Sequence, residues 1–150
     1  MYTLVREQHL PVSPAEAWRF ISRPENLNRI TPKDLGFQIL SELPEEMYPG
    51  LIIQYRIKLP ILGWQRWVTE IKHVQNGIRF VDEQRFGPYR FWYHLHELEE
   101  QNGEVLMRDR VHYTLPFGFL GRIAHALFVR RMLEQIFSFR EAALKEMFGN

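Results

Sequence analysis

The stretch that decides the fold runs from Trp92 to Thr114 and reads WYHLHELEEQNGEVLMRDRVHYT. Asn102-Gly103 near its centre is the residue pair most typical of a two-residue β-hairpin turn. Apolar and polar residues alternate on both sides of this pair, which is the period of a half-buried strand. Because residues that flank such a turn lie opposite each other, the stretch predicts two antiparallel strands in a defined register.

This register places polar side chains on one face of the sheet. It pairs Trp92 with Tyr113. It also pairs His96 with Asp109, and it puts His94 on the same face. Two imidazoles and a carboxylate therefore share a face with large apolar residues. Such a face is typical either of a ligand pocket or of a core whose polar groups satisfy one another.

A second hairpin is predicted around Asn76-Gly77, and the connection at Gly87-Pro88 joins it to the first. With a two-residue turn, Trp67 lies opposite Phe86 and Thr69 lies opposite Gln84. The length of the connection decides whether the two hairpins present their apolar faces to the same side. A two-residue loop puts these faces on opposite sides, whereas a three- or five-residue loop unites them.

We predict the united arrangement, because the alternative buries Arg108, Arg110 and His112. One concave face then carries Tyr55, Trp67, Thr69, Phe80, Asp82, Gln84, Trp92, His94, His96, Asp109 and Tyr113.

The N-terminal part predicts one strand and two short helices. The strand is Tyr2 to Leu10, and it ends before Pro11. Helices are predicted from about Pro14 to Ile21 and from about Pro24 to Ile30, because Ser13 and Ser22 each stand three residues before a glutamate, as in a capping box. Between Leu35 and Leu115, turn pairs separate β-rich segments and predict a six-stranded antiparallel meander.

After Pro116-Phe117-Gly118 the apolar residues follow a period of 3.6, which indicates helix. From Phe128 onward this predicts a long amphipathic helix of roughly 20 residues. Apolar residues from Leu120 to Leu127 fall on another side of the helical wheel, which predicts a separate short helix and a bend. The apolar stripe predicted for the long helix consists of Met132, Leu133, Ile136, Phe139, Ala143, Leu144 and Met147.

Arg140 falls inside this apolar stripe, where a charge requires a partner. Asp82 and Asp109 are the inward-facing carboxylates of the predicted sheet. We predict an ion pair between Arg140 and one of them that joins the helix to the sheet. The alternative is that the guanidinium binds an anionic or carbonyl group of a ligand.

Composition excludes several classes of protein. The chain has 150 residues with 19 Lys and Arg against 18 Asp and Glu, so it lacks the strong positive field that nucleic-acid binding requires. It has no cysteine, which removes disulfides, thiol nucleophiles and zinc-thiolate sites. No apolar run has the length of a membrane span, and Met1 to Leu10 lacks a signal-peptide pattern. We expect one soluble, cytoplasmic domain over residues 1–150.

The segment His94-Leu95-His96, with Asp109 opposite, has three interpretations. His-x-His and Asp supply three metal ligands on adjacent strands. An imidazole oriented by Asp109 can also move protons as a general acid or base. A structural or ligand-orienting hydrogen-bond pair requires neither. We favour the third interpretation and expect no resident metal or cofactor.

The stretch from Phe117 to Arg131 combines aromatic and aliphatic residues with basic ones and contains no acid. It predicts either weak peripheral contact with an anionic membrane or a solvated helix flank. The residues concerned are Phe119, Leu120, Leu127, Phe128, Arg122, His125, Arg130 and Arg131.

Four segments resemble the polyketide cyclase/dehydrase-like branch of the START-related helix-grip superfamily, often labelled SRPBCC ligand-binding proteins. They are FVDEQRFGPY (80–89), WYHLH (92–96), DRVHYTLPFG (109–118) and IFSFR (136–140). The resemblance spans essentially the whole chain. It implies an α+β helix-grip fold, in which a curved seven-stranded antiparallel sheet wraps around a long C-terminal helix and encloses a hydrophobic cavity.

We therefore expect a carrier or sensor for a hydrophobic or aromatic small molecule, such as a lipid, quinone or polyketide. One alternative is a cyclase- or dehydratase-like lyase or isomerase that uses His94, His96 and Asp109. Another is a membrane-associated lipid or quinone carrier. The expected ligand-binding residues are Tyr55, Trp67, Thr69, Phe80, Asp82, Gln84, Trp92, His94, His96, Asp109, Tyr113 and Arg140.

Overall fold

Seven strands form one antiparallel sheet in the order β1-β7-β6-β5-β4-β3-β2. The computed structural model describes residues 1–149. The strands are β1 (Tyr2–Leu10), β2 (Gln38–Ile39), β3 (Ile52–Leu59), β4 (Gly63–Gln75), β5 (Arg79–Phe86), β6 (Phe91–Gln101) and β7 (Glu104–Thr114). The helical elements are α1 (Pro14–Ile21), η1 (Pro24–Ile30), η2 (Lys33–Leu35), α2 (Gly118–Ala124), η3 (His125–Val129) and α3 (Arg130–Phe148).

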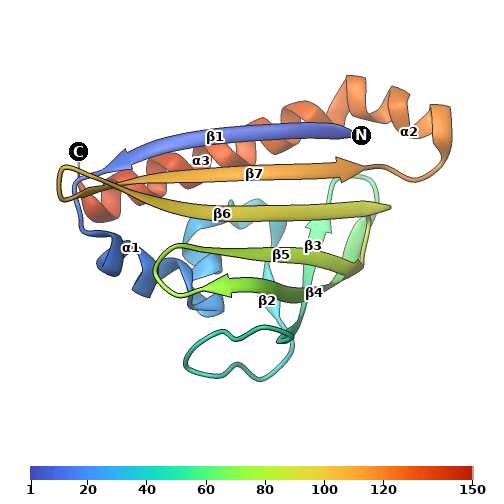
Figure 1. Cartoon of the computed structure of the whole chain (residues 1–150). Helices are drawn as coiled ribbons and strands as arrows, with labels where there is room; N and C mark the ends of the chain where they lie inside the picture. The colour runs from blue at the N-terminus through green and yellow to red at the C-terminus, as the bar shows by residue number, and fades with distance from the viewer. Residues whose placement is uncertain (150) are drawn as a thin grey trace.

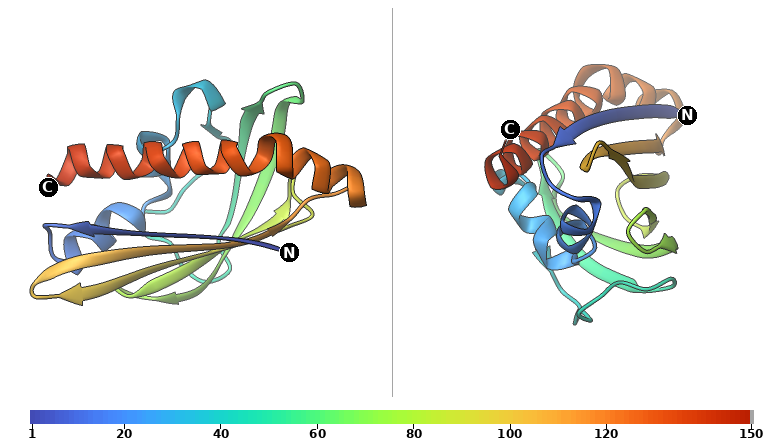
Figure 2. Two further views of the ribbon diagram at one scale, coloured as in Figure 1. Left: turned by 90° about the horizontal axis from the view of Figure 1, so that it is seen from above. Right: turned by 60° about the vertical axis from the view of Figure 1, so that its left-hand side comes forward.

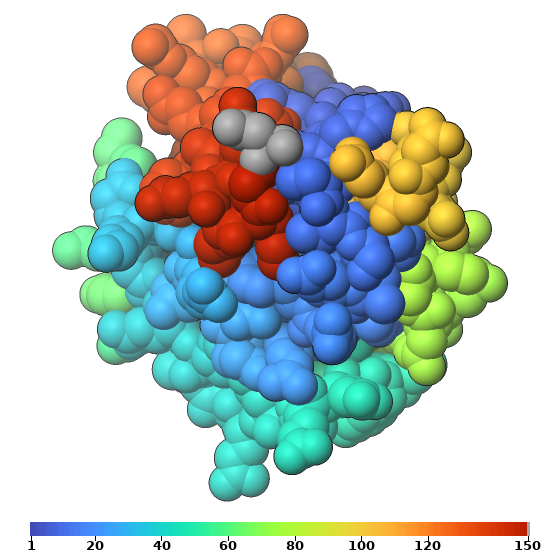
Figure 3. Space-filling model, turned by 90° about the vertical axis from the view of Figure 1, so that its left-hand side faces the viewer, coloured from blue at the N-terminus to red at the C-terminus, as the bar shows by residue number. Residues whose placement is uncertain are grey.

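The sheet curves around α3, which lies across its concave face (Figures 1 and 2). Figure 3 shows the end of the molecule where the last turns of α3, the α1 region and the β6–β7 turn lie together. A small apolar core closes this end, with Leu10, Phe20, Leu98 and Leu144 among its members. The predicted α+β helix-grip architecture is confirmed.

The β6–β7 hairpin has the register that its turn predicts. Asn102 and Gly103 have φ angles of 54° and 82°, the left-handed conformation that a type I′ turn requires. The ladder pairs His96 with Asp109, and it pairs Trp92 with Tyr113. The turn chemistry therefore determines which side chains of these two long strands face α3.

The predicted pairing of Trp67 with Phe86 is wrong. Phe86 pairs with Val68, because the ladder shifts by one residue between Val68 and Thr69. This irregularity turns Phe86 outward, where 63% of its surface is exposed. The next predicted pair along the strands, Thr69 with Gln84, is confirmed.

The faces of the two hairpins unite as predicted, although their connection is longer than a simple turn. The last pair of the β5–β6 ladder is Glu83 with Tyr93, and Asp82 pairs with His94. An odd number of residues separates Glu83 from Tyr93, which keeps the inward side chains of both strands on one face. Gln84 stabilises the connection through two hydrogen bonds to the backbone of Tyr89, of 2.6 and 3.0 Å.

The two N-terminal helices have the predicted bounds but different caps. The Ser13 hydroxyl accepts a 3.2 Å hydrogen bond from the Glu16 amide, so the first cap is confirmed. Ser22 does not start the second helix. Its amide donates to the Trp18 carbonyl and ends α1. The segment Pro24–Ile30 is a 3-10 helix, and its short turns cover the cavity beside α3.

The predicted break before the long helix is a π-helical segment, His125–Val129, that joins α2 to α3 without a loop. A π turn contains an extra residue per turn, so it rotates the following helix about its axis. This rotation explains why the apolar residues of α2 and α3 fall on different sides of one wheel. No helix in residues 1–149 is long and apolar enough to span a membrane.

The inward stripe of α3 differs from the predicted one at a single aromatic position. Phe137 is 4% exposed and Phe139 is 40% exposed, so the prediction chose the wrong phenylalanine. Arg140 is buried, as predicted. The buried residues follow the helical repeat as Leu133, Phe137, Arg140 and Leu144.

We expect Gly121→Ala to destabilise the fold, because the β7–α2 connection packs backbone against backbone. A Cβ atom on Gly121 would clash with the Pro116 carbonyl oxygen. Relief of such overpacking costs about 3 kcal/mol in the free energy of unfolding, measurable by urea denaturation. A cost below about 1 kcal/mol would contradict this packing.

Gly118→Asn is the matched control. A Cβ on Gly118 meets none of the described atoms within 4 Å, and asparagine tolerates its φ of +55°. We expect this variant to remain within about 1 kcal/mol of the unsubstituted protein.

Candidate functional site

A cavity of about 170 Å³ lies between the concave face of the sheet, α3 and η1. Its wall is mostly aromatic and aliphatic. Of the residues expected to bind a ligand, those that line it are Tyr55, Trp67, Thr69, Phe80, Asp82, Trp92, His94, His96 and Arg140. The turn-derived register therefore brings most of the predicted site together at one cavity.

Three predicted site residues lie outside the cavity lining. The Gln84 side chain is occupied by the backbone of Tyr89. Asp109 is buried and contacts Arg140. The Tyr113 hydroxyl lies 2.7 Å from Nε2 of His125, which stacks on Tyr2. These side chains support neighbouring residues instead of facing the cavity.

Several lining residues were missed because they lie outside the regular strand pattern. Tyr89, in the β5–β6 connection, packs 4.8 Å from Trp92 between ring centroids. Phe37 and Met47 come from the irregular segments around β2. Phe137 of α3 contacts His94 edge to face at 5.6 Å. Of these residues, only Phe137 lies in a segment with a recognised apolar repeat, and there the prediction chose Phe139.

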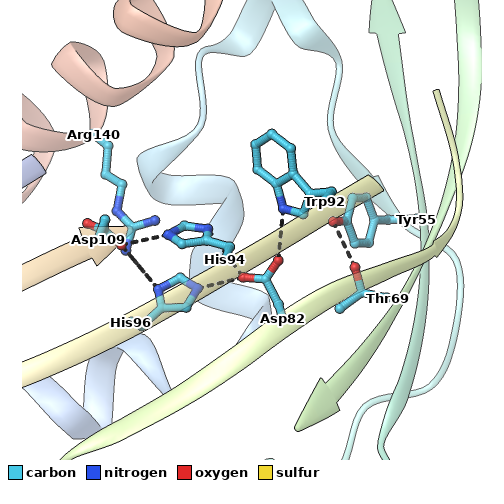
Figure 4. A network of polar contacts seen from close by, with 8 residues as sticks. All are labelled: Tyr55, Thr69, Asp82, Trp92, His94, His96, Asp109 and Arg140. Carbon is cyan, nitrogen blue, oxygen red and sulfur yellow. Dashed lines mark hydrogen bonds and ion pairs between the residues drawn. The ribbon is translucent and has the colours of Figure 1, made fainter. Parts of the chain in front are cut away.

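A polar cluster forms part of the cavity wall (Figure 4). Asp82 projects from β5, and its carboxylate lies 2.5 Å from Nε2 of His96 and 3.4 Å from Nδ1 of His94. The same carboxylate accepts a 3.3 Å hydrogen bond from the Trp92 indole. The two imidazoles are stacked, with centroids 3.7 Å apart. Neighbouring strands thus bring two histidines and a carboxylate into direct contact.

Asp109 and Arg140 complete the cluster. Oδ1 of Asp109 lies 2.8 Å from Nε2 of His94 and 3.3 Å from Nδ1 of His96. Nη2 of Arg140 lies 3.3 Å from the same oxygen. The predicted ion pair between helix and sheet is confirmed, and Asp109 is its carboxylate partner. Each histidine therefore lies between two carboxylates.

The two carboxylates remain ionised despite burial. Burial by itself raises the pKa of Asp109, but the Arg140 charge and the hydrogen bonds with His94 and His96 outweigh it and hold this pKa well below its usual range. Burial likewise acts to raise the pKa of Asp82, and the neighbouring His94 and His96 outweigh it, so the pKa is lowered.

The pKa values of the two histidines shift in opposite directions. Burial and the neighbouring His96 lower the pKa of His94, against the attraction of the carboxylates. Burial also acts to lower the pKa of His96, but hydrogen bonds with Asp109 and Asp82 outweigh it and raise the pKa. A protonated His96 beside a neutral His94 makes the cluster electrically neutral, because two carboxylates then balance Arg140 and one imidazolium.

A second polar group lies on the neighbouring strands. The Tyr55 hydroxyl is 3.2 Å from the Thr69 hydroxyl, and burial raises the pKa of Tyr55, which keeps the phenol protonated. Within residues 1–149, the buried Nε1 of Trp67 has no hydrogen-bond partner. A buried indole donor without an acceptor is uncommon in folded proteins.

Asp82, His94 and His96 are the residues that could hold a metal ion. Their ligand atoms all lie within 4.8 Å of one another. A divalent ion would require His96 to lose its proton, and it would add positive charge beside Arg140. Without an ion, the two carboxylates already contact Arg140 and both histidines.

Comparisons with solved structures identify the same fold at low sequence identity. TTHA0849 from Thermus thermophilus is 14% identical with a TM-score of 0.73, and the match covers 97% of this chain and 95% of that one. Ara h 8.0201, a Bet v1-like helix-grip protein, is 15% identical with a TM-score of 0.61, and the match covers 97% and 98% of the two chains.

A nucleoside-diphosphate sugar epimerase from Corynebacterium glutamicum is 23% identical with a TM-score of 0.69. That match covers 95% of this chain but only 28% of the epimerase chain, so it concerns a part of that enzyme. No protein-family model and no curated protein sequence matches the chain. The comparisons therefore establish the helix-grip fold.

We expect His94→Gln and His96→Gln to change the pH dependence of stability in opposite directions. A raised folded-state pKa stabilises the protein below the unfolded value of about 6.5, and this contribution disappears as pH rises through the folded pKa. The stability lost in His96→Gln should therefore be larger at pH 5.5 than at pH 8. For His94, whose pKa is lowered, the stability lost should be smaller at pH 5.5 than at pH 8.

Urea denaturation of both variants and the unsubstituted protein across this range measures the effect. His112→Gln is the control, because this histidine lies on β7 outside the cluster, with Nδ1 3.1 Å from the Thr3 hydroxyl. Parallel pH profiles for His94→Gln and His96→Gln would contradict the assignment of charge to His96.

Proposed function

We propose that the chain binds a small hydrophobic molecule with an aromatic ring and one polar group, as a carrier or sensor. The observation that carries this proposal is an apolar cavity with one polar wall, formed by Asp82, His94, His96 and Arg140. An apolar cavity of about 150 Å³ takes up benzene, so a cavity of about 170 Å³ fits one or two fused rings. Affinity would come from burial of apolar surface.

The polar wall would orient the bound molecule. Asp82 faces the cavity and can accept a hydrogen bond from a ligand hydroxyl, while Tyr55 or Thr69 can donate one to a carbonyl. The unpaired indole Nε1 of Trp67, whose ring packs against Tyr55 and Tyr89, is a further hydrogen-bond donor in the cavity lining. Few polar groups in an apolar wall are typical of sites that select ligand orientation.

The proposal includes membership of the SRPBCC ligand-binding proteins. The helix-grip neighbours support the fold. Three of the four segments that resemble this family contribute His94, His96, Asp109 and Arg140 to one cluster. In this interpretation residues 1–150 are one ligand-binding domain that acts in the cytoplasm, and binding requires no cofactor, metal or nucleic acid.

An enzymatic function is the second candidate, and the opposite pKa directions of His94 and His96 favour it. A neutral imidazole beside a protonated one provides a base and an acid at the same pH, which is how paired groups divide these roles in many active sites. Cyclisation, dehydration or isomerisation of an enol or phenol would use such a pair.

We expect Ile136→Trp to reduce binding of 1-naphthol more than tenfold, because Ile136 lines the cavity and an indole would occupy it. Quenching of intrinsic tryptophan fluorescence measures the affinity, and denaturing mass spectrometry of organic extracts identifies the molecule bound in the cell. Phe139→Trp is the matched control, because Phe139 lies three residues away on the same helix and is 40% exposed.

Equal binding by Ile136→Trp, Phe139→Trp and the unsubstituted protein would contradict occupation of the cavity. Once an extracted compound is identified, His94→Gln separates the two functions. A binding protein retains affinity for that compound within a few-fold. If the protein is an enzyme that uses His94 as its base, His94→Gln still binds the compound with the same stoichiometry but no longer converts it.

A further inference from the structure

Six large apolar side chains are exposed together on α2, η3 and the residue before them. At least half of the surface of each is exposed. We call them the α2 patch: Phe117, Phe119, Leu120, Ile123, Leu127 and Phe128. Contiguous exposed apolar surface of this kind marks a site of interaction with another molecule.

The inward side of the same segment packs on the β7 end of the sheet. Between Gly118 and Arg131, only Gly121 and His125 are buried. Gly121 packs on the Pro116 carbonyl, while His125 stacks on Tyr2 with centroids 3.5 Å apart and lies 2.7 Å from the Tyr113 hydroxyl. Figures 1 and 2 show that α2 projects beyond the end of the sheet. The fold therefore presents the patch outward, away from the sheet.

The charged side chains within the segment that carries the α2 patch are all positive. Arg122, Arg130 and Arg131 are exposed, and the sequence contains no Asp or Glu between Asp109 and Glu134. Arg130 lies 3.5 Å from Glu134, one turn further along α3. A projecting apolar surface whose own segment carries basic and no acidic residues is complementary to an anionic surface.

We propose that the α2 patch docks on the surface of an anionic lipid bilayer. Its aromatic and aliphatic side chains would enter the boundary between headgroups and acyl chains, while Arg122, Arg130 and Arg131 contact lipid phosphates. A bilayer fits better than a folded protein partner, because the patch projects beyond the sheet and the basic side chains are close to the apolar ones along the same helical segment.

The position of the α2 patch relative to the cavity gives this contact a further consequence. Met132 and Leu133 line the cavity and follow Phe128 by about one helical turn. Docking therefore brings the α3 wall of the cavity next to the bilayer. The membrane contact itself goes beyond the proposed ligand binding, because it depends on surface residues that do not line the cavity.

Flotation of the full chain with vesicles tests the proposal. We expect the protein to float with phosphatidylcholine vesicles that contain 30% phosphatidylserine, and to float at least tenfold less with pure phosphatidylcholine or at 0.5 M salt. Charge reversal of Arg122, Arg130 and Arg131 to Glu should reduce binding at least tenfold. Phe119→Asn combined with Phe128→Asn should do the same with the basic residues intact.

Two control variants keep composition comparable. Reversal of the exposed Arg19, Arg66 and Arg110 to Glu produces the same change of net charge elsewhere. Tyr48→Asn removes an exposed aromatic from the loop after β2. Both should float like the unsubstituted protein. Retained affinity for 1-naphthol in the patch variants would show that the cavity is intact, which separates this test from that of the proposed function.

Three results would overturn the proposal. The first is that the protein does not float with anionic vesicles at low salt. The second is that both sets of arginine reversals reduce flotation equally. The third is a dimer, detected by light scattering without lipid, that Phe119→Asn with Phe128→Asn dissociates. In that case the α2 patch is an interface between two copies of the chain.

Discussion

The buried charge cluster between the sheet and α3 is the constraint on which the rest of the structure depends. Asp109 lies within 3.3 Å of Arg140 and contacts both histidines, so one carboxylate connects β7, β6 and the long helix. A buried pair of this kind contributes little net stability but penalises arrangements that separate its members. The cluster therefore acts as a register between helix and sheet, because rotation of α3 would leave Arg140 without a counter-charge.

The same cluster defines the chemical character of the cavity. Asp82, His94, His96 and Arg140 contribute to its wall, while the remainder is apolar and aromatic. Because carboxylates, imidazoles and a guanidinium lie side by side in the cluster, the wall offers both donors and acceptors of hydrogen bonds. This property fits a neutral ligand with one polar group better than an anion. One arrangement thus joins the helix to the sheet and, in the proposed function, would orient the ligand.

Sequence reasoning succeeded where local rules determine geometry. Asn102-Gly103 set the β6–β7 register, which placed His96 opposite Asp109. It failed where packing overrode the local rule. The ladder irregularity beside Val68 moved Phe86 out of the face, and the choice between Phe137 and Phe139 depended on the rotation of α3. The contact of Arg140 with Asp109 fixes that rotation, and the helical period of the apolar residues does not by itself reveal it.

By itself, the sequence determined the class of fold, the order of its elements and the shared face of the two histidines, since turn residues and alternation act over a few residues. Only the tertiary structure decided that Asp109, and not Asp82, pairs with Arg140, and that Tyr89 and Phe37 line the cavity. It also decided that the apolar side of α2 faces outward. These features depend on contacts between segments that are far apart in the sequence. The free energy of burying apolar surface selects among such contacts, and no short sequence pattern encodes it.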